Sequence, residues 1–504
     1  MSSLAFTNGP HFAIRNVSPH FTKNMPFGWI GQRHLLSILL FACVFINYLQ
    51  RVNISVAVVA MTLKINNTDN GDTQPQTFDW NTSERSTILS SFFWGYLVMN
   101  LPAAVLGRFI NNKYLLAMST TVGSILACTS PIIVSYLGWK GLTGLRLFQG
   151  VFQAFMMPMV HGIMSKWAPP QERGRLVGFI LGGIQFGTMI ILVMAGFLAS
   201  SSLGWPSIFY ISGALGLVWV VFWMIFGDTS PTNSKIISEE ELKYIVKNIN
   251  YHDEKEKRLK TPWRHILTSL PVWAVVVAHT AHNWGFWLLL TEMPQFFSSV
   301  LKINIKEDGL LSALPYLAMW CLMFPVSYVA DKMIHGEIAS ITTTRKLWNS
   351  IGMWGGCVGL AALGYLDDQE VTAIITYIFI VAIGCSVNCG FNVNHMDLSP
   401  NFAGILMGMT NAAASAGGLL APLSVAYIVK DMNSMIQWRQ VFFSGAAILF
   451  FGNLFYIIFA SGNLQKWNEP AESKPFILKA YFDCPSLKKS LVKKKLQITC
   501  CKLL

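Results

Sequence analysis

Long apolar runs separated by short polar segments recur along nearly the whole chain. One membrane-spanning helix needs about 20 mostly apolar residues, and the runs predict about twelve helices of that length. Their approximate positions are 34–61, 86–108, 114–136, 142–164, 176–199, 207–228, 268–290, 309–330, 347–365, 371–393, 403–429 and 440–461. The pattern is typical of an all-α polytopic membrane protein and not of a soluble enzyme with a membrane anchor.

The longest polar interruption, residues 229–267, divides the predicted spans into two equal sets. Within it, the segment SEEELKYIVKNI has the helical spacing of a short amphipathic helix that lies on a membrane surface. We therefore expect five regions: a cytosolic tail (1–33), an N-terminal bundle (34–228), a cytosolic linker (229–267), a C-terminal bundle (268–461) and a basic cytosolic tail (462–504).

The two halves carry a weak internal repeat. PPQERGRLVG (169–178) aligns without gaps on SPNFAGILMG (399–408), and the second proline, a glycine, a leucine and the last glycine match. Duplicated helix bundles are a feature of transporters that alternate access around a site near the membrane midplane. The repeat predicts two pseudo-symmetric six-helix bundles with a site between them.

Composition and charge placement agree with a membrane protein. The 504 residues are 53% apolar and only 12% charged, with a mean hydropathy of +0.45. The net charge of +12 comes from Lys and Arg in loops and tails, which does not favour nucleic acid as a partner. Most of the 37 Lys and Arg fall on one side of the membrane, and this bias predicts that both termini are cytosolic.

Two further features concern processing and metals. The nine cysteines form no CxxC pair, so we expect neither a metal site nor structural disulfides. Residues 1–33 lack an apolar core, and the first span is expected to act as an uncleaved signal anchor. The predicted outer loop 62–85 carries glycosylation sequons at Asn66 and Asn81.

A single arginine stands inside the first span, in NYLQRVNISVAVVAM. Burying Arg51 at this depth costs roughly 2.5–3.5 kcal/mol. Tyr48, Arg51 and Ser55 share one helical face. Arg51 either faces a cavity or holds the bundle together through backbone carbonyls. The cavity is favoured, because ionisable residues within the membrane usually mark functional sites.

Two other spans contribute candidates for the same site. The repeat places His282, in AHTAHNWGFWLLL, at nearly the depth of Arg51 on the opposite side of the cavity. In the fourth span Arg146 shares a stripe with Gln153. Arg146 either recognises an anion with its planar fork or lies near the outer interface and reaches water there. Together these side chains predict an electropositive cavity.

Other polar residues receive supporting roles. Tyr96, in SFFWGY, can direct its hydroxyl at an anion while its ring stays in apolar surroundings. Asp331, in VADK, and Arg173 are expected to form a gate at the cytosolic end. His161 and His395 lie near cytosolic helix ends, where a structural role is favoured.

Several stretches together resemble the anion:cation symporters of the major facilitator superfamily, which include sialin, the vesicular glutamate transporters and the type I sodium–phosphate cotransporters. These stretches are NYLQRVNISVAVVAM, SFFWGYLVMNLP, HGIMSKWAPPQERGRL, TPWRHILTSLPVWAVVVA, GFNVNHMDLSPNFAGILMGMTN and IFASGNLQKW. In detail the chain is most similar to insect members described as inorganic phosphate cotransporters. The resemblance implies substrate contact at Arg51, support from Tyr96, and roles for Arg146 and for Asn411, which follows MGMT.

The chain departs from the family pattern at two positions. Proton-coupled members have a glutamate where this chain has Gln153, and a glutamine does not take up and release a proton. Glutamate-transporting members have an arginine where this chain has His282. Proton transfer through another group such as His282, sodium coupling and uncoupled anion movement therefore all stay open.

These features predict a secondary transporter of a small anion, such as phosphate, sialate, urate or glutamate, that works by alternating access. We expect no cofactor beyond a coupling Na⁺ or H⁺, a monomer, and a plasma, endolysosomal or vesicular membrane. An anion channel and a non-transporting sensor are the alternatives on the same fold. An enzyme is disfavoured, since no nucleophile–base pair, metal cluster or phosphate loop is evident.

Overall fold

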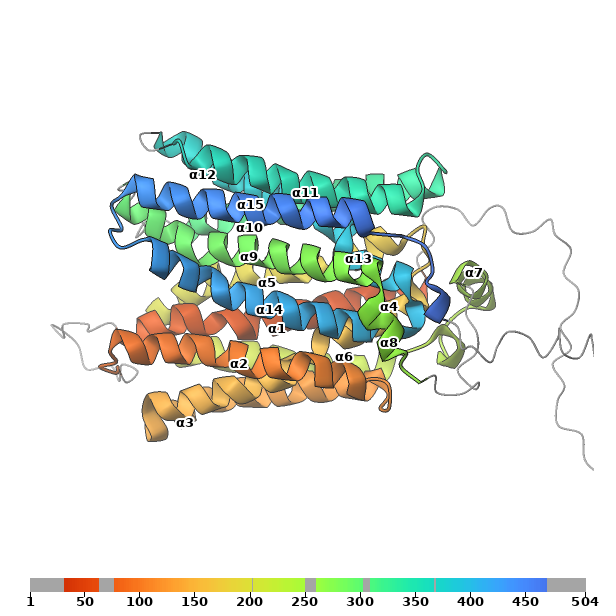
Figure 1. The fold of residues 1–504 in the computed structure, drawn as a ribbon. Coiled ribbons are helices and arrows are strands. Elements are labelled where there is room, and N and C mark those ends of the chain that lie inside the picture. Colours follow the sequence, from red (N-terminus) through yellow and green to blue (C-terminus); the bar gives the residue numbers. More distant parts are fainter. Residues whose placement is uncertain are drawn as a thin grey trace, which may run out of the picture.

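A computed structural model describes residues 31–62, 77–201, 203–249, 260–301, 309–366 and 369–468. All regular elements in these ranges are helices, and the long ones run side by side (Figure 1). The predicted all-α class is confirmed. The Asn66 sequon and most of both predicted tails lie outside the described residues.

The first half of the chain forms six helices before the linker. They are α1 (Gln32–Thr62), α2 (Thr82–Leu106), α3 (Asn112–Gln153), α4 (Met156–Trp167), α5 (Arg173–Ser200) and α6 (Pro206–Phe226). The linker contains η1 (Pro231–Asn233), α7 (Glu239–Ile249) and α8 (Trp263–Thr268).

The second half repeats this arrangement. Its helices are α9 (Leu270–Ser299), α10 (Gly309–His335), α11 (Ile341–Leu363), α12 (Glu370–Ile383), η3 (Gly384–Cys389), α13 (Phe391–Leu398), η4 (Pro400–Phe402), α14 (Ala403–Ile428), α15 (Met435–Phe459) and η5 (Lys466–Asn468).

In the part of the chain that the structure describes, nine helical segments are long and apolar enough to cross a membrane. One of them, Asn112–Trp167, is a hairpin that reverses at Gly138, whose φ of 59° suits a glycine. The Ser119 hydroxyl donates to the Phe152 carbonyl at 2.7 Å, which places the two arms side by side. Counting both arms separately, and adding the 30-residue α9 and the 23-residue α11, gives the predicted twelve spans.

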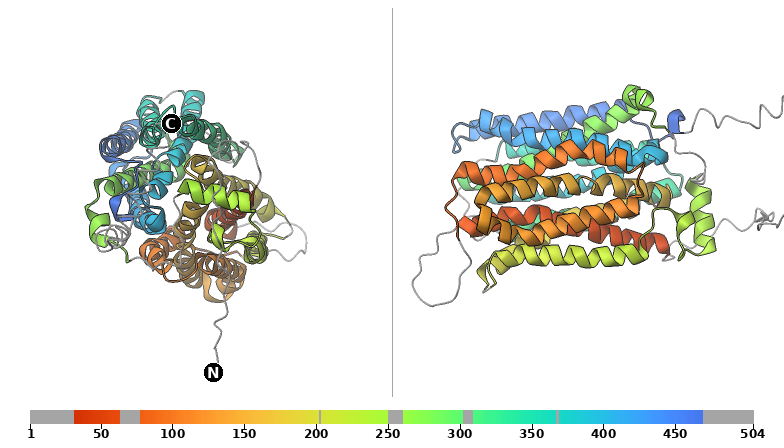
Figure 2. Two further views of the ribbon diagram at one scale, coloured as in Figure 1. Left: turned by 90° about the vertical axis from the view of Figure 1, so that its right-hand side faces the viewer. Right: turned by 90° about the horizontal axis from the view of Figure 1, so that it is seen from below.

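The helices group into two bundles. One cluster of buried apolar side chains draws only on residues 266–460, whereas a second draws only on residues 49–209. A third cluster belongs mainly to the first half and includes Val393, Met396, Ala403 and Met407 of the second. Seen along the helices, the two halves lie beside each other (Figure 2). Two cores that meet along one face agree with the predicted two-bundle architecture.

The linker helix α7 and the first turn of α1 lie at the same end of the molecule, termed here the linker end (Figure 1). The Glu241 carboxylate accepts hydrogen bonds from the backbone N–H groups of Gln32 at 2.8 Å and Arg33 at 3.1 Å. Ile245 is fully buried. The predicted amphipathic helix therefore forms, but its buried face packs on the N-terminal bundle. The opposite end is termed the far end.

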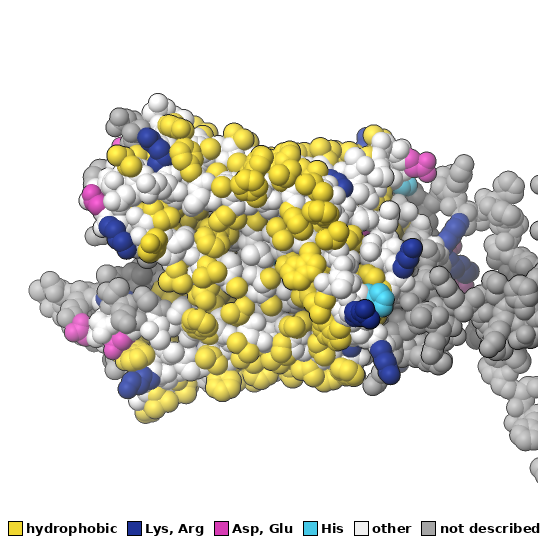
Figure 3. All heavy atoms as spheres, in the orientation of Figure 1, with side chains coloured by type: hydrophobic (Ala, Val, Ile, Leu, Met, Phe, Trp, Pro, Cys, Tyr) yellow, Lys and Arg dark blue, Asp and Glu magenta, His cyan; other side chains and the backbone are white. Residues whose placement is uncertain are grey.

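The surface has an apolar middle and charged ends. In Figure 3 apolar side chains cover the central part of the face, while charged side chains lie toward the two ends. At the far end Asn81 caps α2, because its side chain accepts from the Glu84 N–H at 2.9 Å and Glu84 accepts in return from the Asn81 N–H. This distribution suits a chain that crosses a bilayer several times.

Candidate functional site

Arg51 lies in the interior of the molecule with 6% of its surface exposed. Its Nη1 donates to the Tyr48 hydroxyl at 3.3 Å, whereas its Nε and Nη2 have no hydrogen-bond partner. Among the described residues no carboxylate forms an ion pair with it. Two donors of a buried cation are thus left for a ligand.

Aromatic rings surround this guanidinium. Its central carbon lies 4.6 Å from the centre of the Tyr48 ring, 4.8 Å from Phe92 and 4.4 Å from Tyr96. Each such contact contributes roughly 0.5–1 kcal/mol or more when desolvated. Three of them offset much of the cost of burying Arg51, which is roughly 2.5–3.5 kcal/mol. The rings stabilise the cation without neutralising it, so its charge remains available.

Arg51 lines a cavity between the two bundles with a water-accessible volume of about 90 Å³. Tyr48 and Tyr96 line it from the N-terminal bundle, and His282 and Asn411 line it from the C-terminal bundle. No Asp or Glu of the described ranges lines it. At about 15 Å³ per water molecule the cavity holds roughly six waters, or a small anion in their place. Five of the seven substrate-binding residues predicted from the sequence therefore line this one cavity.

Asn411 connects the bundles at the edge of this cavity. Its amide donates to the Tyr96 hydroxyl at 2.7 Å and to Asn100 Oδ1 at 2.8 Å, both on α2. On the far-end side, Phe93 meets Trp287 edge to face at 4.8 Å, again across the bundle interface. Side chains from both bundles therefore enclose the space beside Arg51.

Arg146 and Gln153 do not line the cavity. Arg146 donates to the backbone carbonyls of Gln50 at 3.0 Å and Arg51 at 2.9 Å, and also to Gln149. Gln153 is fully buried, with its amide 3.5 Å from Gln50 Oε1. Arg146 thus binds backbone carbonyls, which was the structural alternative predicted for Arg51. Through these bonds it fixes the backbone that carries Arg51.

The tenth span is broken between α12 and α13. After Ile383 the chain continues as the short 3-10 helix η3, and Gly390 has non-helical φ and ψ. The equivalent position of the fourth span, after Gln153, keeps helical φ and ψ through Ala154 and Phe155. At the break in the tenth span, Asn388 contributes to the cavity wall.

Sequence reasoning missed several wall residues. Asn388 and Asn392 follow Ile383, after which the tenth span is broken, and Gln185 comes from α5. Each is an amide side chain inside an otherwise apolar run, and that contrast is the signal that would have identified them.

The linker end holds ion pairs that join the bundles. Asp331 of α10 is fully buried and accepts from the backbone N–H groups of Gly174 at 3.0 Å and Arg175 at 2.7 Å, at the start of α5. A helix N-terminus favours a carboxylate in this position. Arg173 pairs with Asp397 at 2.6 Å, and Asp397 pairs with Arg345 at 2.7 Å. The two predicted gating residues, Asp331 and Arg173, thus bridge the bundles.

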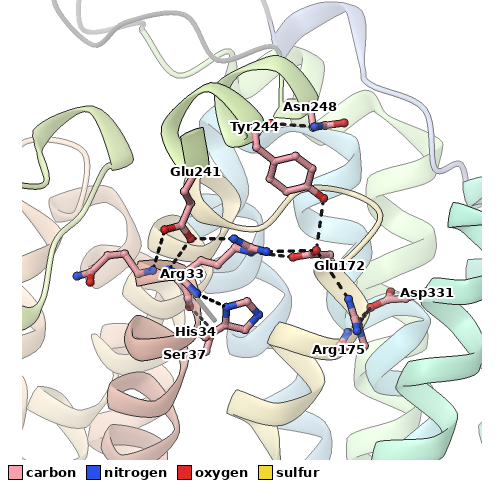
Figure 4. A network of polar contacts seen from close by, with 11 residues as sticks. Arg33, His34, Ser37, Glu172, Arg175, Glu241, Tyr244, Asn248 and Asp331 are labelled. Carbon is pink, nitrogen blue, oxygen red and sulfur yellow. Dashed lines mark hydrogen bonds and ion pairs between the residues drawn. The ribbon is translucent and has the colours of Figure 1, made fainter. Parts of the chain in front are cut away.

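A second set of polar contacts connects the linker to this region (Figure 4). Arg33 pairs with Glu172 at 2.8 Å and with Glu241 of α7 at 2.9 Å. The Tyr244 hydroxyl donates to Glu172 at 3.4 Å. Burial, together with the Glu172 charge, raises the pKa of Tyr244 to about 12, so the phenol keeps its proton and remains a donor. Glu172 also pairs with Arg175, which contacts Asp331.

Glycines of the internal repeat allow the bundles to meet. A Cβ on Gly174 would collide with Asp331, and one on Gly408 would collide with Ala104. Both residues lie on repeat-related helices, α5 and α14, and both contacts cross the interface. The matched glycines of the sequence repeat therefore correspond to close helix approaches at the linker end.

A family model described as the Major Facilitator Superfamily matches residues 40–422. A Drosophila melanogaster protein named "Putative inorganic phosphate cotransporter" is 36% identical over 90% of this chain and 90% of its own length. Human sialin is 34% identical, covering 86% of this chain and 90% of its own. Vesicular glutamate transporter 3 of Danio rerio is 35% identical, covering 92% and 78% respectively.

Among solved structures, the proton:xylose symporter XylE superposes with a TM-score of 0.67. The match covers 86% of this chain and 97% of XylE, at 15% sequence identity. At that identity the match shows the fold alone, which is the two-bundle fold described above.

Proposed function

Because the chain belongs to the major facilitator superfamily, whose members are membrane transporters and not enzymes, we propose that it moves a small anion by alternating access between its two bundles. The observation that carries this proposal is the Arg51 guanidinium. It is buried, it lines the central cavity, and two of its nitrogens have no partner. An anion that accepts from both would complete the hydrogen bonding of the site.

Residues from both bundles would hold this anion. Arg51 supplies charge and paired donors, while Tyr96 and Tyr48 offer hydroxyl groups beside it. His282 and Asn411 face the same cavity from the C-terminal bundle. A ligand that touches both sides favours closure of the bundles around it, which is the step that alternating access requires. Arg146 acts as a positioning residue through the carbonyl of Arg51.

The size of the cavity favours a compact substrate. A volume of about 90 Å³ accepts phosphate or a small carboxylate without rearrangement, whereas a sugar acid such as sialate requires the cavity to widen. Relatives at similar identity are named for inorganic phosphate and for glutamate. Inorganic phosphate is therefore the first substrate to test, followed by glutamate, urate and sialate.

The proposed orientation places the linker end in the cytosol. Basic residues concentrate in the segments at that end, as the positive-inside rule requires. The ion pairs of Asp331 and Asp397 close this end, so the anion enters from the far end once Phe93 and Trp287 separate. The protein is proposed to act as a monomer in the plasma membrane or in an endolysosomal or vesicular membrane, with Asn66 and Asn81 glycosylated.

The experiment is uptake by purified protein in liposomes. Phosphate, glutamate, urate and sialate are supplied as radiolabelled solutes under separately imposed proton, sodium and voltage gradients. A transporter shows counterflow, in which unlabelled anion on one side accelerates entry of labelled anion from the other. Uptake without counterflow would identify a channel, and absence of uptake for all four anions would contradict the proposed function.

A further inference from the structure

The titratable side chains on the cavity wall limit how a proton could be coupled to transport. Within the described ranges these are Tyr48, Arg51, Tyr96, His279 and His282, and no carboxylate is among them. Only histidine changes its charge near neutral pH in its ordinary state. A coupling proton that a side chain of the described cavity wall takes up must therefore reside on a histidine.

Below the cavity, His279 begins a continuous line of hydrogen bonds. Its Nδ1 lies 3.1 Å from the Thr410 hydroxyl, and the same hydroxyl lies 2.8 Å from Nε2 of His395. Nδ1 of His395 lies 3.0 Å from the backbone carbonyl of Asn392. His279, Thr410 and His395 are all buried, so the line passes through protein from the cavity toward the linker end.

The bonding pattern fixes the direction of the donors. A carbonyl only accepts, so His395 carries its hydrogen on Nδ1 and its Nε2 is an acceptor. The Thr410 hydroxyl lies 2.8 Å from this Nε2 and 3.2 Å from the Met407 carbonyl, and in the shorter of these two contacts it donates to Nε2. It accepts from Nδ1–H of His279. His279 Nε2 is then the free lone pair on the cavity side. These tautomers are assigned from the hydrogen-bond partners.

We propose that His279, Thr410 and His395 form a proton relay that couples anion movement to protons, an inference that rests on the proposed function. A proton from the cavity binds His279 Nε2. His279 passes its Nδ1 proton to the Thr410 oxygen, and Thr410 passes its own proton to His395 Nε2. In total one proton enters from the cavity and one positive charge appears on His395. His279 is again neutral, and Thr410 keeps the hydrogen that it received from His279.

The end of the relay lies at the bundle interface. The His395 ring is 5.5 Å from the ring of His161, which belongs to α4 of the other bundle and whose buried Nε2 has no partner. Asp397, two residues further along α13, holds Arg173 of the other bundle and Arg345 of α11.

A proton on His395 is attracted by Asp397 and repelled by both arginines. The other titratable groups packed around this region are His279 and His282 of α9, Asp331 of α10, Cys389 of η3 and Tyr456 of α15. The added positive charge faces Arg173 and His161 across the interface. Protonation therefore weakens closure of the linker end, so proton arrival and opening toward that end are linked.

Thr410 offers a matched pair of variants for the test. Thr410→Val keeps the shape of the side chain but removes the hydroxyl, whereas Thr410→Ser keeps the hydroxyl. Both variants and the wild-type chain are reconstituted in liposomes and tested in two assays. The first measures phosphate counterflow, with unlabelled phosphate inside the liposomes, and the second measures phosphate uptake under an imposed proton gradient. His34→Gln, at the start of α1 and away from the relay, serves as the histidine control.

The two assays separate exchange from coupling. Counterflow needs anion exchange but no net proton transfer, whereas accumulation needs the relay. A gradient of about one pH unit supports about tenfold accumulation for each coupled proton. Thr410→Val is expected to retain counterflow and lose this accumulation, while Thr410→Ser and His34→Gln retain both. His395→Gln should behave as Thr410→Val does.

Other results would overturn the relay. These are full proton-driven accumulation by Thr410→Val, equal loss of both activities in Thr410→Val and Thr410→Ser, and wild-type accumulation driven by sodium alone. If wild-type protein exchanges neither phosphate nor the other three anions, the proposed function fails and the relay fails with it. Wild-type exchange without proton dependence contradicts only the relay.

Discussion

Buried arginines occupy two regions of the molecule, and their surroundings differ. At the linker end Arg33, Arg173 and Arg345 each contact at least one carboxylate at 2.6–2.9 Å. In the centre Arg51 and Arg146 have no carboxylate partner among the described residues, and aromatic rings and backbone carbonyls surround them instead. The first group is neutralised within the protein, and the second is not.

This difference indicates that the arginines of the linker end hold the two bundles together, whereas a central arginine is available to bind an anion. A buried ion pair is strongly destabilising when one partner is removed, because the other charge is left uncompensated. The ion pairs of the linker end therefore hold the bundles in one arrangement. An unpaired cation next to a cavity gains most from a ligand that brings the missing charge. Arg51 is the only arginine or lysine on the described cavity wall, and for this reason we propose it as the group that binds the anion.

The largest expected effect is on transport by Arg51→Ala. Loss of two charge-assisted hydrogen bonds, each worth about 1.5–3 kcal/mol, should reduce uptake at least about 100-fold. Expression and thermal stability should be retained, because the substitution removes a buried charge that no carboxylate of the described residues compensates. Uptake in liposomes and thermal unfolding in detergent are measured on the same preparation. Loss of folding together with uptake would instead favour a structural role for Arg51.

For Asp397→Asn we expect a large loss of stability, in contrast to the retained stability of Arg51→Ala. Neutralising this carboxylate leaves Arg173 and Arg345 buried without compensation, which should lower the free energy of unfolding by roughly 3–5 kcal/mol. Thermal unfolding of Asp397→Asn and Arg51→Gln is compared, since each variant replaces one buried charge with an amide. Equal stability of the two proteins would remove the distinction between paired and unpaired regions.

Asp331→Asn should shift the conformation more than the stability. Asp331 accepts from the Gly174 and Arg175 N–H groups across the interface, and an amide accepts less strongly. A loss of about 1.5 kcal/mol raises the population open at the linker end roughly tenfold. The rate at which an impermeant thiol reagent, added at the linker end, labels Met407→Cys on the cavity wall reports this change. An unchanged rate would show that Asp331 does not contribute to closure.

The smallest effect is expected at the far end, where Asn81 caps α2. Asn81→Ala should cost about 1 kcal/mol of stability and remove the sequon. Ser83→Ala removes the sequon but leaves the cap. Expressed in a glycosylating cell, both variants should therefore lose the same glycan, whereas after enzymatic deglycosylation only Asn81→Ala should melt below wild type. A normal melting temperature for Asn81→Ala would show that the cap contributes nothing.

The sequence predicted the parts of the fold that depend on the bilayer. Span length and apolar content are set by membrane thickness, so the twelve spans and the short helix in the linker could be found. The position of Arg51 on the cavity wall could also be expected, because a polar stripe within an apolar helix indicates which face is not exposed to lipid.

Other features depend on contacts between distant segments. Arg173, Arg345 and Asp397 come from three helices, and no local pattern links them. The stripe that contains Arg146 and Gln153 shows which face of the helix is polar, but it does not show which helix packs against that face. Their position behind Arg51 could therefore not be predicted. The break between α12 and α13 lies in a largely apolar run, where Gly384 and Gly390 are the residues that most favour the end of a helix.

Anion-dependent thermal stability of the wild-type protein and of Arg51→Gln tests the central claim most directly. The anion is the one that wild-type protein exchanges in liposomes, added at constant ionic strength. At a concentration of 100 times its dissociation constant, binding stabilises the wild-type protein by about 2.7 kcal/mol. The account predicts a clear rise in the melting temperature of wild-type protein and none for Arg51→Gln. An equal rise in both proteins would show that the anion binds elsewhere.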